Sequence, residues 1–172
     1  MDQLWAPWRL AYVAKDAPSR EGDDCFICRG LAERDDRKNQ IVQRTGRSVV
    51  LLNTYPYNNG HLLVAPRAHK GRMDELTPDE LLDANEQIRR MVALLERLIK
   101  PDGFNIGMNL GKVAGAGLPG HLHWHVVPRW HGDTNFMPVV ADVKVIAQSL
   151  ESLYQILVDS MAIGGQHGEP GA

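Results

Sequence analysis

Three histidines alternate with bulky apolar residues in one short segment, His121-Leu122-His123-Trp124-His125. If this segment is a β-strand, residues two apart point to the same face, so the three imidazoles share one face and the apolar side chains share the other. Neutral imidazole is a nucleophile near pH 7 because its ordinary pKa is about 6.5. The pattern therefore favours attack by one imidazole on phosphorus, with neighbouring rings as hydrogen-bond donors.

The alternating histidines have two other interpretations. On a regular strand the outer α-carbons lie about 13 Å apart, whereas zinc–nitrogen bonds are about 2 Å long. Three histidines on one strand are therefore poorly placed around one ion, although a zinc hydrolase that uses His121 and His123 as ligands remains an alternative. A chance cluster of surface histidines is disfavoured by the strict alternation.

The segment directly before the histidines, residues 109–120, is rich in glycine. Glycine lets backbone amides approach an anion closely, so this loop is a candidate phosphate-binding segment. It is not a Walker loop, because it lacks the Gly-Lys-Ser/Thr ending. The loop alone is a weak signal, and its position directly before the histidines strengthens it.

The two cysteines of the chain, Cys25 and Cys28, have the spacing of a zinc knuckle. A redox pair or two free thiols would give the same spacing. So few cysteines do not indicate the disulfide framework of an extracellular protein.

Composition sets the broad class of protein. A chain of 172 residues with 44% hydrophobic and 23% charged residues suits one globular domain. A formal net charge of −2 gives no general basic surface, so we expect no nucleic-acid partner. We also expect no membrane association and a cytoplasmic location, since no apolar run has the length of a membrane span and the N-terminus lacks the form of a signal peptide.

Two long amphipathic helices are expected to support the site. The first is expected to begin after Thr77, where Pro78 suits the first helical turn and Glu80 completes a capping box, and to end before Pro101. Apolar residues at three- and four-residue steps also predict a helix over residues 142–159. A short helix over 28–34 is a weaker expectation.

Short runs rich in valine, isoleucine and leucine predict about five strands, over residues 40–44, 48–52, 62–65, 104–109 and 123–128. Strands in succession around one long helix predict an α+β fold with an antiparallel sheet, one long helix and a C-terminal helix. We expect one domain over residues 1–162, with an N-terminal arm over 1–39, and a disordered tail over 163–172.

The sequence HLHWHVV at residues 121–127 resembles the signature of the histidine triad (HIT) family, in which three histidines alternate with apolar residues. Residues 53–69 and 103–111 resemble further segments of that family, in the branch that includes diadenosine tetraphosphate phosphorylases and hydrolases. The resemblance implies a HIT-like fold, a homodimer and an adenosine nucleotide substrate such as AMP or a diadenosine polyphosphate. It also implies hydrolysis or nucleotidyl transfer through a covalent nucleotidyl-histidine. The alternative function is a nucleotide-sensing or partner-binding HIT module with negligible turnover.

The resemblance also assigns site residues. It implies that His123 is the nucleophile, that His125 contacts the phosphate or the leaving group, and that His61 supports this cluster. Gly117 stands where many hydrolases of the family have glutamine, so backbone amides are expected to replace that side chain. The expected nucleotide-binding residues are Asn53 at the ribose, Asn109 at the phosphate, Gly117, Leu118, His123 and His125.

The family resemblance extends to a metal site. In zinc-bearing relatives two histidines complete the pair of cysteines, and the matching positions here are His69 and His121. We therefore expect a structural zinc held by Cys25, Cys28, His69 and His121, and no catalytic cofactor.

Overall fold

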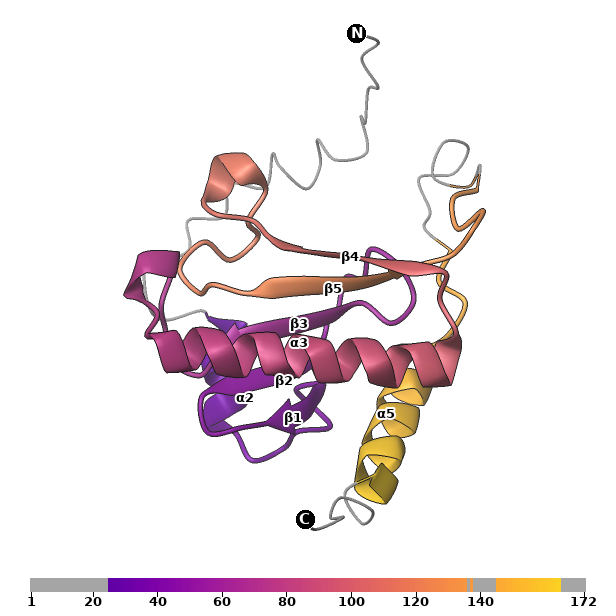
Figure 1. Cartoon of the computed structure of the whole chain (residues 1–172), viewed down its shortest axis with the longest axis horizontal. Helices are drawn as coiled ribbons and strands as arrows, with labels where there is room; N and C mark the ends of the chain where they lie inside the picture. The colour runs from indigo at the N-terminus through magenta and orange to yellow at the C-terminus, as the bar shows by residue number, and fades with distance from the viewer. Residues whose placement is uncertain (1–24, 136, 138–144, 165–172) are drawn as a thin grey trace, which may run out of the picture.

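A five-stranded antiparallel sheet forms the centre of the protein (Figure 1). The computed structural model describes residues 25–135, 137 and 145–164. The order of strands across the sheet is β1-β2-β3-β5-β4, with β4 at one edge. The strands are β1 (Ile41–Arg44), β2 (Ser48–Leu52), β3 (Leu62–Pro66), β4 (Gly103–Met108) and β5 (Trp124–Arg129).

The long helix α3 (Pro78–Ile99) begins where the sequence predicts. The Thr77 side chain accepts a hydrogen bond from the Glu80 amide, and the Glu80 carboxylate accepts one from the Thr77 amide at 2.7 Å. These bonds satisfy amides that have no partner within the helix. In Figure 1 the helix passes in front of the sheet, and its buried residues join the main core.

The last described helix, α5 (Leu150–Gly164), begins later than predicted. The predicted start at residues 142–144 lies outside the described residues, and residues 145–149 are not helical. The side chain of Ser149 accepts a hydrogen bond from the amide of Ser152 at 3.1 Å, which is the pattern of an N-cap. The predicted tail overlaps the end of α5 at 163–164, and residues 165–172 lie outside the described part.

The two faces of the sheet are covered differently. One face packs against α3 and α5 and contains most of the buried apolar residues, among them Val64, Leu95, Val126 and Leu157. The other face carries a smaller cluster beside the short helix α2 (Phe26–Ala32). The helices therefore stabilise one side of the sheet and leave much of the other available for polar side chains.

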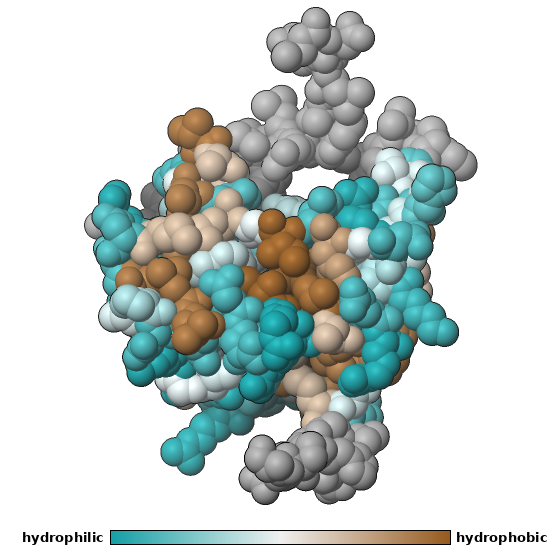
Figure 2. Space-filling model, in the orientation of Figure 1, coloured by the Kyte–Doolittle hydropathy of each residue, from teal (hydrophilic) through white to brown (hydrophobic). Residues whose placement is uncertain are grey.

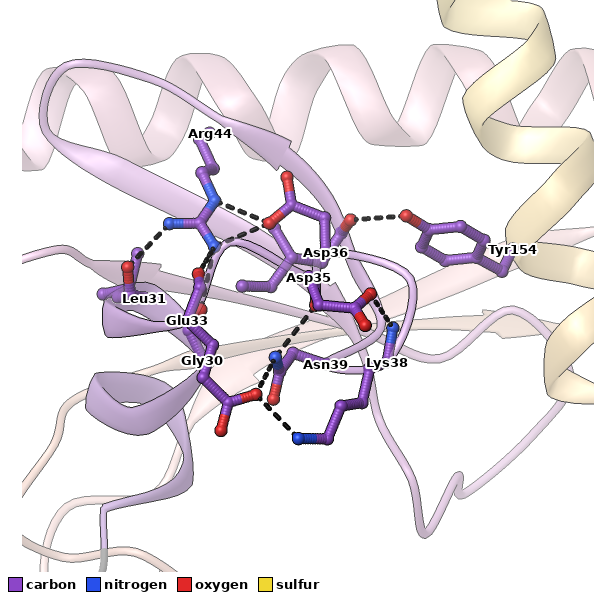
Figure 3. Close-up of polar contacts among 10 residues, drawn as sticks. Gly30, Leu31, Glu33, Asp35, Asp36, Lys38, Asn39, Arg44 and Tyr154 are labelled. Atoms are coloured by element: carbon purple, nitrogen blue, oxygen red, sulfur yellow. Dashed lines mark hydrogen bonds and ion pairs between the residues drawn. The ribbon is translucent and has the colours of Figure 1, made fainter.

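Arg44 fixes α2 to the sheet (Figure 3). Its guanidinium donates to the carbonyl oxygens of Gly30 and Leu31 at 2.8 and 2.9 Å and to that of Glu33 at 3.1 Å. It also pairs with the Asp36 carboxylate at 2.6 Å. Carbonyl groups at the end of a helix lack partners within the helix, so one arginine satisfies several of them and orders the segment that carries the cysteines.

The predicted fold class is confirmed, and small shifts of the element ends have local causes. Gln40 has a φ of 55° and therefore lies outside β1 rather than in it. Helix α2 starts two residues before the predicted short helix because the Cys25 sulfur accepts from the Cys28 amide and caps it. Over the described residues, no helix combines the length and the apolar character needed to cross a membrane.

Candidate active site and metal cluster

The segment of the three alternating histidines leads into β5 and is not one regular strand, because His121 and His123 precede β5. Only His125 lies within β5, and the predicted strand start at His123 is one residue too early. The alternation nevertheless holds, because Leu122, Trp124 and Val126 are all buried in the main core beside α3 and α5. The histidines consequently occupy the opposite side, where the smaller cluster lies.

His123 is oriented by a backbone carbonyl. Its Nδ1 lies 2.8 Å from the His121 carbonyl oxygen, and the ring is 7% exposed. A carbonyl oxygen only accepts, so Nδ1 carries the proton and Nε2 keeps its lone pair. Burial lowers the pKa of His123, which favours this neutral form. The arrangement is that of an aimed, unprotonated nucleophile.

His61 and His125 are linked in a directed hydrogen-bond chain. The backbone amide of Tyr57 donates to His61 Nδ1 at 2.9 Å, so that nitrogen is an acceptor and the neutral ring carries its proton on Nε2. His61 Nε2 lies 2.9 Å from His125 Nδ1 and donates to it. His125 therefore carries its own proton on Nε2 and can donate it in a hydrogen bond to a ligand.

Asn53 lies beside the hydrogen-bonded pair of His61 and His125. Its side-chain oxygen accepts from the Tyr55 amide at 3.0 Å, which turns its amide nitrogen toward His61 Nδ1, 3.2 Å away. Asn53, the residue expected at the ribose, thus also contacts the ring of His61.

Tyr57 is a site residue that the sequence analysis did not single out. Its ring is stacked on that of His125, with centroids 5.5 Å apart and planes 27° apart, and it lies 4.7 Å from the ring of His61. Burial, followed by the proximity of His123, lowers the pKa of His125 to about 4. No pattern in the turn-forming sequence around Tyr57 indicates these contacts.

The glycine-rich loop is ordered by its own backbone. Asn109 donates from its side-chain nitrogen to the Gly115 carbonyl at 3.3 Å, across the short 3₁₀ helix η3 (Lys112–Ala114). Gly115 has a φ of 88°, a left-handed conformation that favours glycine. Gly117 is exposed, and Leu118 is partly buried against the smaller cluster.

Four predicted metal ligands lie together. The ligand atoms of Cys25, Cys28, His69 and His121 are all within 4.8 Å of one another. His121 Nδ1 is 3.2 Å from the Cys25 sulfur, and His69 Nδ1 is 3.2 Å from the Cys28 sulfur. Because zinc–ligand bonds are about 2.0–2.3 Å long, ligands of a tetrahedral ion lie roughly 3–4 Å apart, so the cluster fits zinc.

His121 is held on three sides. Its Nδ1 faces the cysteines, its Nε2 donates to the Pro66 carbonyl at 2.8 Å, and its own carbonyl receives the bond from His123. Burial and the adjacent Cys25 raise the pKa of the Cys28 thiol to about 11 in the metal-free protein. A bound metal ion would displace that proton. His123 is outside this cluster, which does not favour a zinc hydrolase with His121 and His123 as ligands.

Arg129 follows the histidine segment and is paired within the protein. Its guanidinium contacts the Asp133 carboxylate at 2.6 and 2.9 Å, and Asn58 donates to the same carboxylate at 2.8 Å. The arginine holds the pKa of Asp133 well below its usual range. This network fixes the turn that carries Tyr57 against the end of β5.

An antiparallel sheet with alternating histidines beside a glycine-rich loop defines the class of protein. The HIT domain family matches residues 34–132, and the chain belongs to this family. A protein of Mycobacterium tuberculosis named AP-4-A phosphorylase is 34% identical over 166 residues, which cover 94% of this chain and 85% of that protein. The asymmetrical bis(5'-nucleosyl)-tetraphosphatase of Schizosaccharomyces pombe is 32% identical over 117 residues, 67% of this chain and 64% of that protein.

Solved structures share the fold. A hypothetical histidine triad nucleotide-binding protein of Sulfolobus tokodaii superposes with a TM-score of 0.67 at 24% identity, over 86% of this chain and all of that one. A zinc-bound histidine triad family protein of Mycobacterium smegmatis gives a TM-score of 0.59 at 22% identity, over 91% of this chain and 93% of that one.

Proposed function

We propose that the protein transfers the adenylyl group of adenosine polyphosphates to water or inorganic phosphate through a covalent adenylyl-His123. The observation that carries the proposal is the bond from His123 Nδ1 to the His121 carbonyl, which leaves Nε2 unprotonated beside the donor His125. The names of the M. tuberculosis and S. pombe relatives support the substrate class.

The proposed reaction has two displacements at the α-phosphorus. The lone pair of His123 Nε2 forms a bond to phosphorus as the bridging P–O bond breaks, and the electron pair of that bond leaves on the polyphosphate oxygen. Water or phosphate then attacks the adenylyl-histidine and returns the electron pair of the N–P bond to His123. Attack by water, which releases a proton, yields AMP, and attack by phosphate yields ADP.

Loop and side-chain donors are assigned to the nucleotide. We assign the backbone amides of Gly117 and Leu118 to the phosphate oxygens, since this loop precedes the histidines and has no glutamine at position 117. Asn53 is assigned to the ribose and Asn109 to the phosphate, and the bond from Asn109 to the Gly115 carbonyl also orders the loop.

We also propose that Cys25, Cys28, His69 and His121 hold a zinc ion whose role is structural. All four ligand positions come from protein side chains, as in closed structural zinc sites. The ion would join α2 to the segment that enters β5.

We propose that the protein forms a homodimer through β4. Among the described strands none pairs with the outer side of β4. Ile106, Leu110 and Val113 are 49%, 49% and 106% exposed, and Figure 2 shows apolar surface over β4 and η3. An exposed strand edge with apolar neighbours is a template for pairing with another chain.

Dimerisation is tested by light scattering coupled to size exclusion. Ile106→Lys is expected to give a monomer, because it places a charge on the free edge. Leu82→Lys is the control, since Leu82 is 71% exposed and belongs to α3 rather than to the sheet. A dimer that persists in Ile106→Lys would contradict pairing through β4.

The activity is tested with diadenosine tetraphosphate, with and without inorganic phosphate. ADP that appears only with phosphate identifies phosphorolysis, and AMP without phosphate identifies hydrolysis. His123→Asn is expected to remove turnover and the covalent adduct, whereas the exposed His131→Asn retains both. Nucleotide binding without turnover across adenosine polyphosphates would instead favour a sensing module, and full activity in His123→Asn would refute the assignment.

A further inference from the structure

We propose that Asn58 is a positioning residue for the reaction at His123. Together with Asp133 it holds the backbone amide of Tyr57 on His61 Nδ1, and it thereby decides which nitrogen of that ring carries the proton. This inference rests on the proposed function and assigns a task in it to a hydrogen-bond network at the end of β5.

The amide of Tyr57 decides how protons are placed on two rings of the site. Its N–H lies 2.9 Å from His61 Nδ1, and a backbone amide can only donate, so neutral His61 is protonated on Nε2. His61 Nε2 donates to His125 Nδ1, 2.9 Å away, which leaves the Nε2–H of His125 for a phosphate oxygen. If the Tyr57 amide turned away, His61 could take its proton on Nδ1. His125 would then present a lone pair to the phosphate instead of a donor.

The turn that carries this amide is held on both sides of it. On one side the Tyr55 amide donates to the side-chain oxygen of Asn53 at 3.0 Å. On the other side Asn58 follows directly, and its carbonyl oxygen accepts from the His61 amide at 3.3 Å. The peptide group that carries the Tyr57 N–H therefore lies between two fixed points.

The side chain of Asn58 is bonded through both its oxygen and its nitrogen. The oxygen accepts from the Asn59 amide at 3.0 Å, so the amino group faces the end of β5. The amino group donates to the Pro128 carbonyl at 3.1 Å and to the Asp133 carboxylate at 2.8 Å. Both hydrogens of the amino group thus have an acceptor, and these acceptors are 70 and 75 residues away in the chain.

Asp133 is a charged anchor for that amino group. Its carboxylate receives two bonds from Arg129, at 2.6 and 2.9 Å, and one from the Trp130 amide at 3.2 Å. Arg129 holds the pKa of Asp133 well below its usual range, so the carboxylate is ionised and only accepts. An ionised acceptor binds an amide donor more strongly than a neutral one does, which keeps Asn58 in one orientation.

The same turn is packed closely against the elements behind it. Gly60 has a φ of 77°, a left-handed conformation that favours glycine. A Cβ atom at this position would lie 2.7 Å from Ile99 Cδ1 at the end of α3 and 3.0 Å from Pro128 Cγ in β5. Close packing at Gly60 and the hydrogen bonds of Asn58 together define where the turn lies.

The first test reads the proton positions directly and needs no substrate. Nitrogen-15 NMR of the histidine rings in the full-length protein should show His61 unprotonated on Nδ1 and protonated on Nε2 near pH 7.5. In Asn58→Ala the Nδ1 signal of His61 should move toward that of a protonated nitrogen, because the two tautomers exchange once the Tyr57 amide is released. An unmoved His61 signal in Asn58→Ala, or a protonated Nδ1 in the wild type, would overturn the inference.

The second test measures how fast the adenylyl-histidine forms from diadenosine tetraphosphate in single turnovers. A donor aimed at a transition-state oxygen contributes about 10²–10³-fold, so loss of the His125 donor from most molecules should slow Asn58→Ala at least about tenfold. A rate equal to that of the wild type would contradict a positioning role. If the wild type forms no adduct, the proposed function fails, while the NMR comparison still decides whether Asn58 sets the proton on His61.

Two control variants separate positioning from a general loss of stability. Asn85→Ala is the same substitution on α3, where the exposed Asn85 side chain donates to the Leu81 carbonyl at 2.7 Å. Leu157→Ala removes packing from the main core. Both variants should keep the wild-type His61 signal and the wild-type rate. A tautomer shift in either would show that the proton position follows stability rather than Asn58.

An exchange of the two side chains tests the part of Asp133. Asn58→Asp alone places two carboxylates side by side and should disturb the His61 signal as Asn58→Ala does. Asn58→Asp combined with Asp133→Asn again sets a donor opposite an acceptor, and it should recover part of the wild-type signal and rate. No recovery in the exchanged protein would exclude Asp133 as the anchor of Asn58.

Discussion

Because His125 is neutral in the folded protein, the free energy of unfolding depends on pH. Comparison with the variant His125→Gln isolates the contribution of this histidine. Burial lowers the pKa of this histidine from 6.5 to about 4. Between these values the unfolded chain binds the proton and the folded protein does not. The stabilisation is therefore present above pH 6.5 and is lost as the pH falls toward 4.

The size of the effect follows from the two pKa values. The whole interval corresponds to about 3 kcal/mol, and about 2 kcal/mol of it falls between pH 7 and pH 5. Because the ring is partly exposed, screening by solvent lowers the expected loss to about 1–2 kcal/mol over that range. Glutamine does not titrate, and its side-chain oxygen can accept the hydrogen bond from His61 Nε2 in place of the imidazole.

Urea unfolding of both proteins at pH 7 and pH 5 measures this difference. The free energy of unfolding of the wild type should fall by about 1–2 kcal/mol more than that of His125→Gln. Contributions of the other histidines are shared by the two proteins and cancel. If both proteins lose the same stability, His125 is not held neutral by the fold and the linkage argument is wrong.

Three further perturbations test other parts of the structure. Arg44→Ala should lower the free energy of unfolding in urea by about 1–3 kcal/mol, because the carbonyl groups at the end of α2 lose a charged donor; a change below about 0.5 kcal/mol would contradict the assigned role. Leu157→Ala should cost about 3 kcal/mol in the same assay, as a cavity in the main core, with the rate of adduct formation unchanged; a slower rate would show that this core reaches the site. Cys28→Ser should reduce the zinc that purifies with the protein, measured by elemental analysis, and unchanged zinc would exclude Cys28 as a ligand.

The start of α3 was predictable because its signals are local. Thr77, Pro78 and Glu80 lie within one turn, and each acts through a neighbouring backbone group. The start of α5 was not predictable in the same way. Apolar residues recur at helical spacing both before and after Ser149, and only the capping bond of Ser149 marks where the helix begins. Periodicity finds the buried stripe of a helix, whereas a side-chain hydrogen bond decides where the helix begins.

The side of the sheet on which each histidine lies was predictable from the two-residue period. Leu122, Trp124 and Val126 are buried in the main core, so the residues between them face the other way. The direction of the bonds between the rings was not predictable. It depends on where the Tyr57 amide points, and backbone placement in a turn has no sequence signal of that precision.

The metal ligands were found by resemblance and not by spacing alone. Cys25 and Cys28 form a local pair, but His69 and His121 are separated by 52 residues in the chain, and the pairing of β3 with β5 brings their segments together. The Asp133 network was missed because Asp133 and Asn58 lie in two separate turns that are 75 residues apart in the chain.

The separation of the two sheet faces has a consequence for how this chain can change. Groups assigned to chemistry lie with α2 and the glycine-rich loop, while most of the apolar interior lies under α3 and α5. Variation in that interior can adjust heat resistance and leave substrate choice untouched, and exchange of a polar residue on the other side can redirect substrate choice at little cost to folding. Laboratory evolution should therefore be able to change stability and substrate choice nearly independently of each other.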